Sequence, residues 1–215
     1  MDVLLGNSDV FLNGFGTTVL LFLCATLVSI AVGLSLGAMR VSPIGVLRAT
    51  SVAYVTLVRN TPLTLLMFFF VFGYPKLGLP DLDYFSLAVV ALGLYTASYV
   101  AEVVRAGVNT VPAGQAEAAR ALGLSFGQSM SSVILPQALR AVSPPIVSVL
   151  IALLKNTTIA AGFSVAEAGA IRATLSERGE PALPVMLWVA CGFVVLVMLL
   201  SLLQRTAERN WSIAR

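Results

Sequence analysis

The sequence predicts an all-α integral membrane protein with five transmembrane helices. Of its 215 residues, 58% are hydrophobic and only 11% are charged, whereas soluble domains carry about 25% charged residues. The mean hydropathy is +0.94. Two segments without a charged residue, 10–39 and 181–204, are 30 and 24 residues long. Each exceeds the roughly 20 apolar residues that a helix needs to cross a bilayer, so they predict the first and fifth spans.

The second and third spans are predicted at 60–75 and 84–101. The third has 18 residues without charge and the second has 16, so the second must include residues before Arg59 to cross the hydrocarbon. Pro62 suits the first turn of the second helix. The moderately apolar segment 51–58 before it is expected to lie along the membrane surface.

The fourth span is predicted at 141–166. A charge-free run of 14 residues is followed there by Lys155, and we interpret the segment as one helix with a lysine inside it. Pro144 and Pro145 are expected to open this helix.

Charge distribution predicts that the N-terminus is outside and the C-terminus is cytoplasmic. Asp2 and Asp9 precede the first span without any basic residue, unlike a cleavable signal peptide, so this helix is expected to be retained. In this orientation three basic residues face outside and nine face the cytoplasm, as the positive-inside rule requires. The outside residues are Lys76, Arg172 and Arg178; the cytoplasmic ones are Arg40, Arg48, Arg59, Arg105, Arg120, Arg140, Arg205, Arg209 and Arg215.

The cysteine and histidine content limits the metal-binding and catalytic chemistry that the chain can support. The chain has no histidine, which excludes histidine-ligated metal sites and histidine base catalysis, and no metal site is expected. Cys24 and Cys191 both fall in predicted spans, where free thiols act as small apolar residues.

The segment 109–140 is predicted to be a cytoplasmic loop with its own helices. It is long for a connection. Residues 115–122 are nearly all strong helix formers, and Gly123 follows where a helix C-terminus favours glycine. Ser125 is a suitable cap for a second helix, 126–135, that ends before Pro136.

A spaced motif lies within this loop. Glu117-Ala118-Ala119 is followed after three residues by Gly123, and after nine more by Val133, one residue before Leu135-Pro136. This pattern resembles the EAA signature of ABC importer permeases, with Val133 where isoleucine is usual. The small alanine side chains allow a docked helix to approach another backbone closely, and Glu117 suits a helix start. An ordinary surface helix is the alternative interpretation.

Further segments are similar to those of polar amino acid permeases. Together with the EAA loop they cover roughly 15–205, and their particular forms look most like permeases of actinobacterial glutamate importers. These segments are Met39–Pro43 (MRVSP), Val58–Leu65 (VRNTPLTL), Ala101–Gly107 (AEVVRAG), Pro112–Gln115 (PAGQ) and Leu153–Ala160 (LLKNTTIA).

The resemblance implies an ABC type I importer transmembrane domain at 15–205, with a cytoplasmic coupling loop at 109–140. It implies a non-enzymatic subunit of the bacterial cell membrane that imports a polar amino acid, glutamate above others. The implied partners are a cytoplasmic ATPase dimer, a second and different permease, and an extracytoplasmic solute-binding protein; no nucleic acid is expected. The residues implied to grip the ATPase are Glu117, Ala118, Ala119, Gly123, Leu135 and Pro136.

ATP hydrolysis is expected to belong to the partner. A phosphate-binding P-loop ends in a glycine-lysine pair, and the only lysines, Lys76 and Lys155, do not follow glycine. We therefore expect no cofactor on this chain, with ATP and magnesium bound by the ATPase.

Polar residues inside spans are costly and are usually functional, so they are candidates for the substrate pathway. The candidates are Thr61, Glu102, Lys155, Asn156 and Thr157. Structural interpretations stay open: Glu102 and Arg105 can pair on one helix face, Lys155 can extend to the interface, and Asn156 and Thr157 can cross-link helices. Arg59 is expected to hold the second helix at the inner surface, with direct substrate contact as an alternative.

Three competing functions remain. The same architecture could import glutamine, arginine or cystine. A secondary transporter or channel would not need a cytoplasmic docking helix, and no internal repeat of the kind common in secondary transporters is visible. A membrane enzyme is disfavoured because no nucleophile and base are visible together among the intramembrane polar residues.

Overall fold

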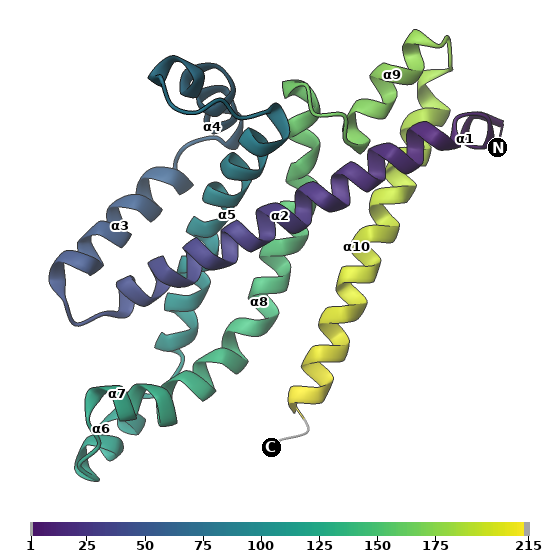
Figure 1. The fold of residues 1–215 in the computed structure, drawn as a ribbon. Helices are drawn as coiled ribbons and strands as arrows, with labels where there is room; N and C mark the ends of the chain where they lie inside the picture. The colour runs from purple at the N-terminus through teal and green to yellow at the C-terminus, as the bar shows by residue number, and fades with distance from the viewer. Residues whose placement is uncertain (1, 213–215) are drawn as a thin grey trace.

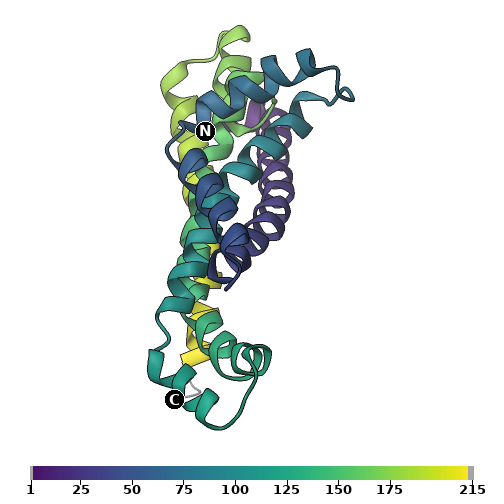
Figure 2. The ribbon, with the colours of Figure 1, turned by 90° about the vertical axis from the view of Figure 1, so that its left-hand side faces the viewer.

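The computed structural model describes residues 2–212 and is all-helical in that range (Figure 1). Side chains of Asp2 and of 207–212 are not described, and Arg215, expected on the cytoplasmic side, lies outside the described residues. The helices form an elongated bundle, with α9 and the N-terminus at one end and α6, α7 and the C-terminus at the other (Figures 1 and 2). We call these the N-terminal end and the loop end.

The elements follow in the order α1 Asp2–Gly6, α2 Ser8–Val41, α3 Gly45–Arg59, α4 Leu63–Phe68, η1 Phe69–Gly73, η2 Tyr74–Leu77, α5 Tyr84–Asn109, α6 Ala113–Ala121, α7 Phe126–Ser129, η3 Met130–Ile134, α8 Leu135–Asn156, η4 Thr157–Phe163, η5 Ala168–Ala170, α9 Ile171–Glu177 and α10 Ala182–Ser212. Four helical segments are long and apolar enough to cross a membrane: 8–41, 84–109, 126–163 and 182–206. The pair 45–59 and 63–77 makes a fifth when counted as one bent span, with a bend of 99°.

Small residues let α2 and α5 cross closely. A Cβ atom on Gly33 would lie 2.5 Å from the Cβ of Val100, and one on Gly37 would lie 2.7 Å from that of Val104. Close backbone approach at glycine is typical of helix pairs in membranes, where packing rather than hydrophobic exclusion drives association. These two helices therefore form the centre of the bundle.

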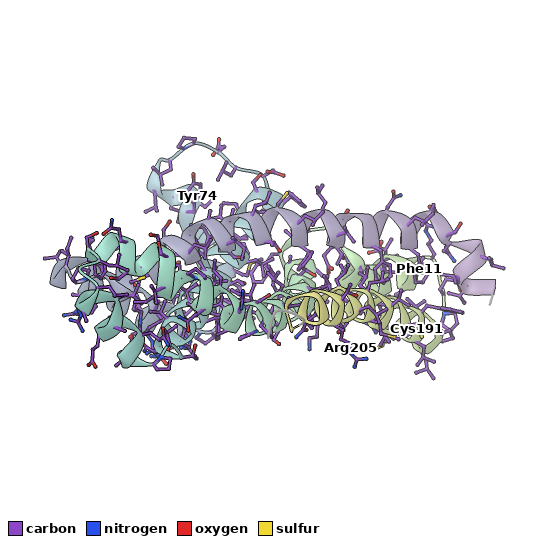
Figure 3. All side chains as sticks on the ribbon, turned by 90° about the horizontal axis from the view of Figure 1, so that it is seen from below. Phe11, Tyr74, Cys191 and Arg205 are labelled. Atoms are coloured by element: carbon purple, nitrogen blue, oxygen red, sulfur yellow. The ribbon has the colours of Figure 1, made fainter. Side chains whose placement is uncertain are left out.

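The main apolar core joins α2, α4, α5 and α8. Its members include Leu21, Met67, Leu92 and Leu153, each at most 1% exposed. By contrast, only 6% of the residues in the most apolar window of α10 are buried, so one face of this helix is left for lipid or another subunit. Near the N-terminal end, Phe11 of α2 and Cys191 of α10 line one apolar crevice (Figure 3). Cys24 and Cys191 are free, as expected.

The segment expected to lie along the surface is instead part of α3. Ser51 and Val55 are buried, and the Ser51 hydroxyl donates to the Leu36 carbonyl of α2 at 2.7 Å. Tyr54 donates to the Leu94 carbonyl of α5 at 2.9 Å. The expectation was wrong because these long-range contacts, not local hydropathy, hold the segment against the bundle.

The helix expected to open at Pro144 and Pro145 begins earlier, at Leu135. Pro136 occupies the first turn of α8, and the two later prolines lie inside the helix. Interior prolines are tolerated in membrane helices, so Pro144 and Pro145 do not mark the start of α8.

A buried carboxylate fastens the segment after η4 to α2. Glu167 is 0% exposed. Its Oε2 accepts a hydrogen bond from the Thr18 hydroxyl at 3.0 Å, and its Oε1 accepts one from the Gly169 amide at 2.7 Å. Burial raises the pKa of Glu167 to about 7, since the charged form loses its hydration.

Candidate transport pathway and coupling loop

The loop between α5 and α8 folds as two short helices joined by a sharp turn. Gly123 has a φ of +77°, the left-handed conformation that glycine adopts without steric cost. Its amide donates to Arg120 O at 2.9 Å, and the Leu124 amide donates to Ala119 O at 3.1 Å. This closes α6 as the sequence predicted.

Ser125 caps the second helix through a capping box. The Gln128 amide donates to the Ser125 hydroxyl at 3.4 Å, and the Gln128 side chain accepts from the Ser125 amide at 2.9 Å. The helix does not end before Pro136 as expected, because α7 and the π-turn η3 run directly into α8. The second helix of the loop is therefore continuous with a spanning helix.

Of the six predicted coupling residues, one is buried and five are exposed. Ala119 is buried at 3% exposure and faces the rest of the loop. Glu117, Ala118, Gly123, Leu135 and Pro136 are exposed. Figure 2 shows this loop beyond the loop end of the spans, clear of the main bundle. An exposed helix with small side chains in that position is suited to docking against another protein.

Three arginines surround Glu102 of α5. Arg105, one turn later, binds the carboxylate through Nε and Nη2, at 3.0 and 2.5 Å. Arg40 Nη2, from α2, lies 3.2 Å from the other oxygen, and Arg59 Nη1, from α3, lies 3.9 Å from it. The carboxylate therefore joins three helices. The structure confirms the predicted pair of Glu102 with Arg105, whereas the participation of Arg40 could not be read from spacing.

A small, mostly apolar cavity with a few polar side chains adjoins this cluster. Its volume is about 180 Å³, and it is lined by Tyr95, Thr96, Tyr99, Val149, Ala152, Leu153 and Asn156. The two tyrosine hydroxyls lie 2.9 Å apart. The guanidinium carbon of Arg59 lies 5.0 Å from the Tyr99 ring centroid, a cation–π distance. None of the lining residues is a carboxylate.

The structure separates the five predicted pathway residues. Asn156 lines the cavity. Glu102 is not a lining residue, but it pairs with Arg59, and Arg59 lies over the ring of Tyr99 in the cavity wall. Thr157 is fully buried, and its hydroxyl donates to the Leu154 carbonyl at 2.7 Å. Thr61 and Lys155 are not among the lining residues; the Thr61 hydroxyl donates to Leu57 O at 2.9 Å, and Lys155 is exposed on α8.

Sequence reasoning missed Tyr95, Tyr99 and Arg40. The tyrosines are four residues apart within a predicted span, which puts them on one helix face, and that spacing could have marked them. Arg40 was counted only as a charge that sets orientation. Its contact with Glu102 joins residues 62 positions apart, and no local pattern indicates such a contact.

Residues 29–212 match the family described as the inner membrane component of binding-protein-dependent transport systems. The chain belongs to this family. It is therefore a multi-pass inner membrane permease that works with an ATPase and a binding protein, and its function is the import of a polar amino acid rather than catalysis.

Individual relatives of this chain are also amino acid transport proteins. The chain is 43% identical over 211 residues to the glutamate transport system permease protein GluC of Corynebacterium glutamicum, covering 92% of each chain. It is 39% identical over 159 residues to the probable glutamine permease GlnM of Bacillus subtilis, covering 74% of this chain and 73% of that one. An amino acid ABC transporter crystallised with histidines superposes with a TM-score of 0.91 at 26% identity, over 97% of both chains.

Proposed function

We propose that this permease imports glutamate. The observation that carries the proposal is the charge around the cavity: its lining residues supply hydroxyls and an amide but no carboxylate, and the neighbouring cluster sets three arginines against the single carboxylate of Glu102. An environment with an excess of positive charge favours an anionic side chain over a cationic one. Similarity to the Corynebacterium glutamate permease supports the same cargo.

The pathway residues take different roles in this proposal. Asn156, Tyr95 and Tyr99 contact the amino acid, with Arg59 providing the attractive charge. Glu102 positions Arg59 by their 3.9 Å ion pair. Thr157 supports the helix end near Asn156 through its bond to Leu154, and Thr61 and Lys155 face surfaces that the rest of the complex covers.

The coupling loop, 109–140, transmits the conformational change of the ATPase to the transport domain, 15–205. The exposed face with Glu117 and Ala118 docks on the ATPase, whereas Ala119 holds α6 to the rest of the loop. Gly123 keeps the turn tight, and Leu135 and Pro136 begin the helix that carries Asn156. The rigid connection from η3 into α8 supports this transmission.

The N-terminus faces outside and the C-terminus faces the cytoplasm. This orientation puts the α6–α7 loop on the ATPase side and follows the excess of arginine in the segments near that side.

The complex contains a second permease of different sequence. The side chains of Tyr95, Tyr99 and Asn156 are half-buried at the surface of the helix bundle. Polar side chains within the membrane are costly when they face lipid, so another subunit is expected to cover them. A symmetric copy would bring a second arginine-rich cluster to the same pathway, so a non-identical partner is favoured. Purification by a tag on this chain, followed by intact mass measurement, is expected to give a heteromer; recovery of only this permease with the ATPase would contradict it.

The cargo is tested with purified complex in proteoliposomes that contain this chain with its ATPase, its second permease and its binding protein. Radiolabelled glutamate, glutamine, arginine and cystine are supplied outside at equal concentrations with the binding protein, and ATP is enclosed in the vesicles, because an importer moves its cargo toward the side of its ATPase. We expect glutamate uptake to exceed each of the others by at least about tenfold. Equal or faster uptake of glutamine, arginine or cystine would contradict the proposal.

A further inference from the structure

The cluster around Glu102 has more positive than negative charge. Arg40, Arg59 and Arg105 face one carboxylate, so two positive charges have no counter-charge within the cluster. Arg105 takes both of its bonds to Oε1, and Oε2 is left to the other two arginines. The net positive charge of the cluster therefore favours the binding of a further anion.

Arg40 carries two buried side-chain donors without an acceptor among the described residues. Its side chain is only 16% exposed. Its Nε and Nη1 atoms are buried and have no hydrogen-bond partner within the part of the chain that the structure describes. Buried charged donors without an acceptor are costly, and charged residues retained in spans mark ion and substrate pathways. The donors of Arg40 therefore need an acceptor that the described chain does not supply.

The cluster continues directly from the tyrosine cavity. Tyr95, Tyr99 and Glu102 are spaced four and three residues apart on α5, which places them along one helix face. Arg59 contacts both Tyr99 and Glu102, at 5.0 and 3.9 Å. An anion that leaves the cavity toward the loop end of α5 meets Arg59 first and Arg40 next.

We propose that Arg40 and Arg59 form a second, carboxylate-binding station, which receives the side chain of an acidic amino acid after it leaves the tyrosine cavity. This inference rests on the proposed import of glutamate. Glu102 competes for the same guanidinium groups and keeps the station weak, since transport requires that a bound ion also leaves. The phosphate of an anionic lipid offers similar chemistry, so the test distinguishes the two sources.

The experiment measures ATP-driven glutamate uptake by the complete complex in proteoliposomes, for the wild type and for Arg40→Gln, Arg40→Lys and Arg48→Gln. Arg48 is an exposed arginine of α3 outside the cluster, so its variant is a control for the same loss of charge. Binding-protein-stimulated ATP hydrolysis and recovery of the partner subunits are measured in parallel as indicators of assembly. Each sample is prepared in phosphatidylcholine alone and in phosphatidylcholine with phosphatidylglycerol.

We expect Arg40→Gln to lower the maximal uptake rate about tenfold, a typical effect of losing a charged hydrogen-bond donor. The concentration for half-maximal uptake stays unchanged, since the binding protein sets it. Arg40→Lys retains about half of the rate, Arg48→Gln retains all of it, and ATP hydrolysis and assembly stay within about twofold for every variant. The result is the same in both lipids.

Several outcomes would overturn the inference. Normal uptake by Arg40→Gln would show that the station is not used, and a parallel loss of ATP hydrolysis or assembly would show that Arg40 is structural. If the wild type loses uptake in phosphatidylcholine alone, the occupant is a lipid phosphate. A wild-type complex that imports another amino acid and not glutamate would overturn the proposed function and this inference together, which distinguishes the two failures.

Discussion

The Arg59 guanidinium lies 5.0 Å from the centre of the Tyr99 ring and also approaches Glu102, at 3.9 Å. Arg59 ends α3, just before the chain bends by 99° into α4 and its continuation, whereas Tyr99 and Glu102 belong to α5. This contact joins the bent span to the wall of the cavity that Tyr99 lines, so the position of the bend and the charge at the cavity are linked.

We expect Tyr99→Ala to lower glutamate uptake more than Tyr99→Phe. Alanine removes the ring under Arg59, whereas phenylalanine keeps the ring and loses only the hydroxyl that meets Tyr95 at 2.9 Å. A cation–π contact of a partly exposed arginine is worth about 0.5–1 kcal/mol, so the rate should fall about two- to fivefold in alanine and less in phenylalanine. Initial uptake rates in proteoliposomes measure this, and equal loss in both variants would assign the effect to the hydroxyl.

Replacing Gly123 by valine should uncouple ATP hydrolysis from uptake. A side chain at a φ of +77° is strained, by roughly 1–2 kcal/mol for a left-handed residue, and the turn after α6 would shift. Gly127→Val is the matched control, because Gly127 lies in the same loop with open space around it and without positive φ. The ratio of glutamate imported to ATP hydrolysed should fall in the first variant only; an unchanged ratio in both would remove the turn from the coupling path.

Gly33→Val should destabilise the bundle, and Gly16→Val should not. A Cβ atom at Gly33 would meet Val100 at 2.5 Å and the Ala97 carbonyl at 3.0 Å, whereas Gly16 of the same helix has nothing within 4 Å. Overpacking of this kind costs about 1–3 kcal/mol. Thermal unfolding in detergent, followed by near-UV circular dichroism, should show a lower midpoint for Gly33→Val alone. Equal midpoints would mean that α2 and α5 separate easily.

The attachment of Glu167 to Thr18 should weaken as pH rises. The folded pKa is about 7, above the ordinary glutamate value of 4.5, so the folded state holds its proton more tightly than the unfolded state does. The contribution to stability is complete below about pH 4.5 and is lost as pH rises through about 7. The largest change is about 3 kcal/mol, from the size of the pKa difference.

Hydrogen exchange at the amides of Ala168 and Gly169, which bond to Thr18 and Glu167, measures this attachment. Their protection, corrected for intrinsic exchange, should fall between pH 5 and pH 8 in the wild type. In Glu167→Gln, which cannot ionise, it should stay constant. A wild-type profile that is flat, or that rises with pH, would contradict the raised pKa.

Local chemistry in the sequence predicted the coupling loop well. Gly123 adopts the left-handed conformation and Ser125 forms a capping box, because turns and caps depend on a few neighbouring residues. Apolar runs likewise predicted the spans at α2, α5 and α10 to within a few residues of their cores.

Long-range contacts explain where the structure differs from what the sequence predicted. Residues of α3 looked like a surface segment because hydropathy does not reveal the bonds from Ser51 to Leu36 and from Tyr54 to Leu94. In the pathway, Asn156 was predicted from its position in a span, but the bond of Thr157 to its own helix and the meeting of Arg40 with Glu102 depend on the folded arrangement.

The most direct test of the account is the energy source of glutamate uptake by the reconstituted complex. The initial rate is compared in vesicles with ATP and no ion gradient, and in vesicles with sodium and proton gradients but no ATP. We predict rapid uptake with ATP and none with the gradients alone. Uptake that follows an ion gradient and ignores ATP would contradict the assignment of this chain as the permease of an ATP-driven glutamate importer.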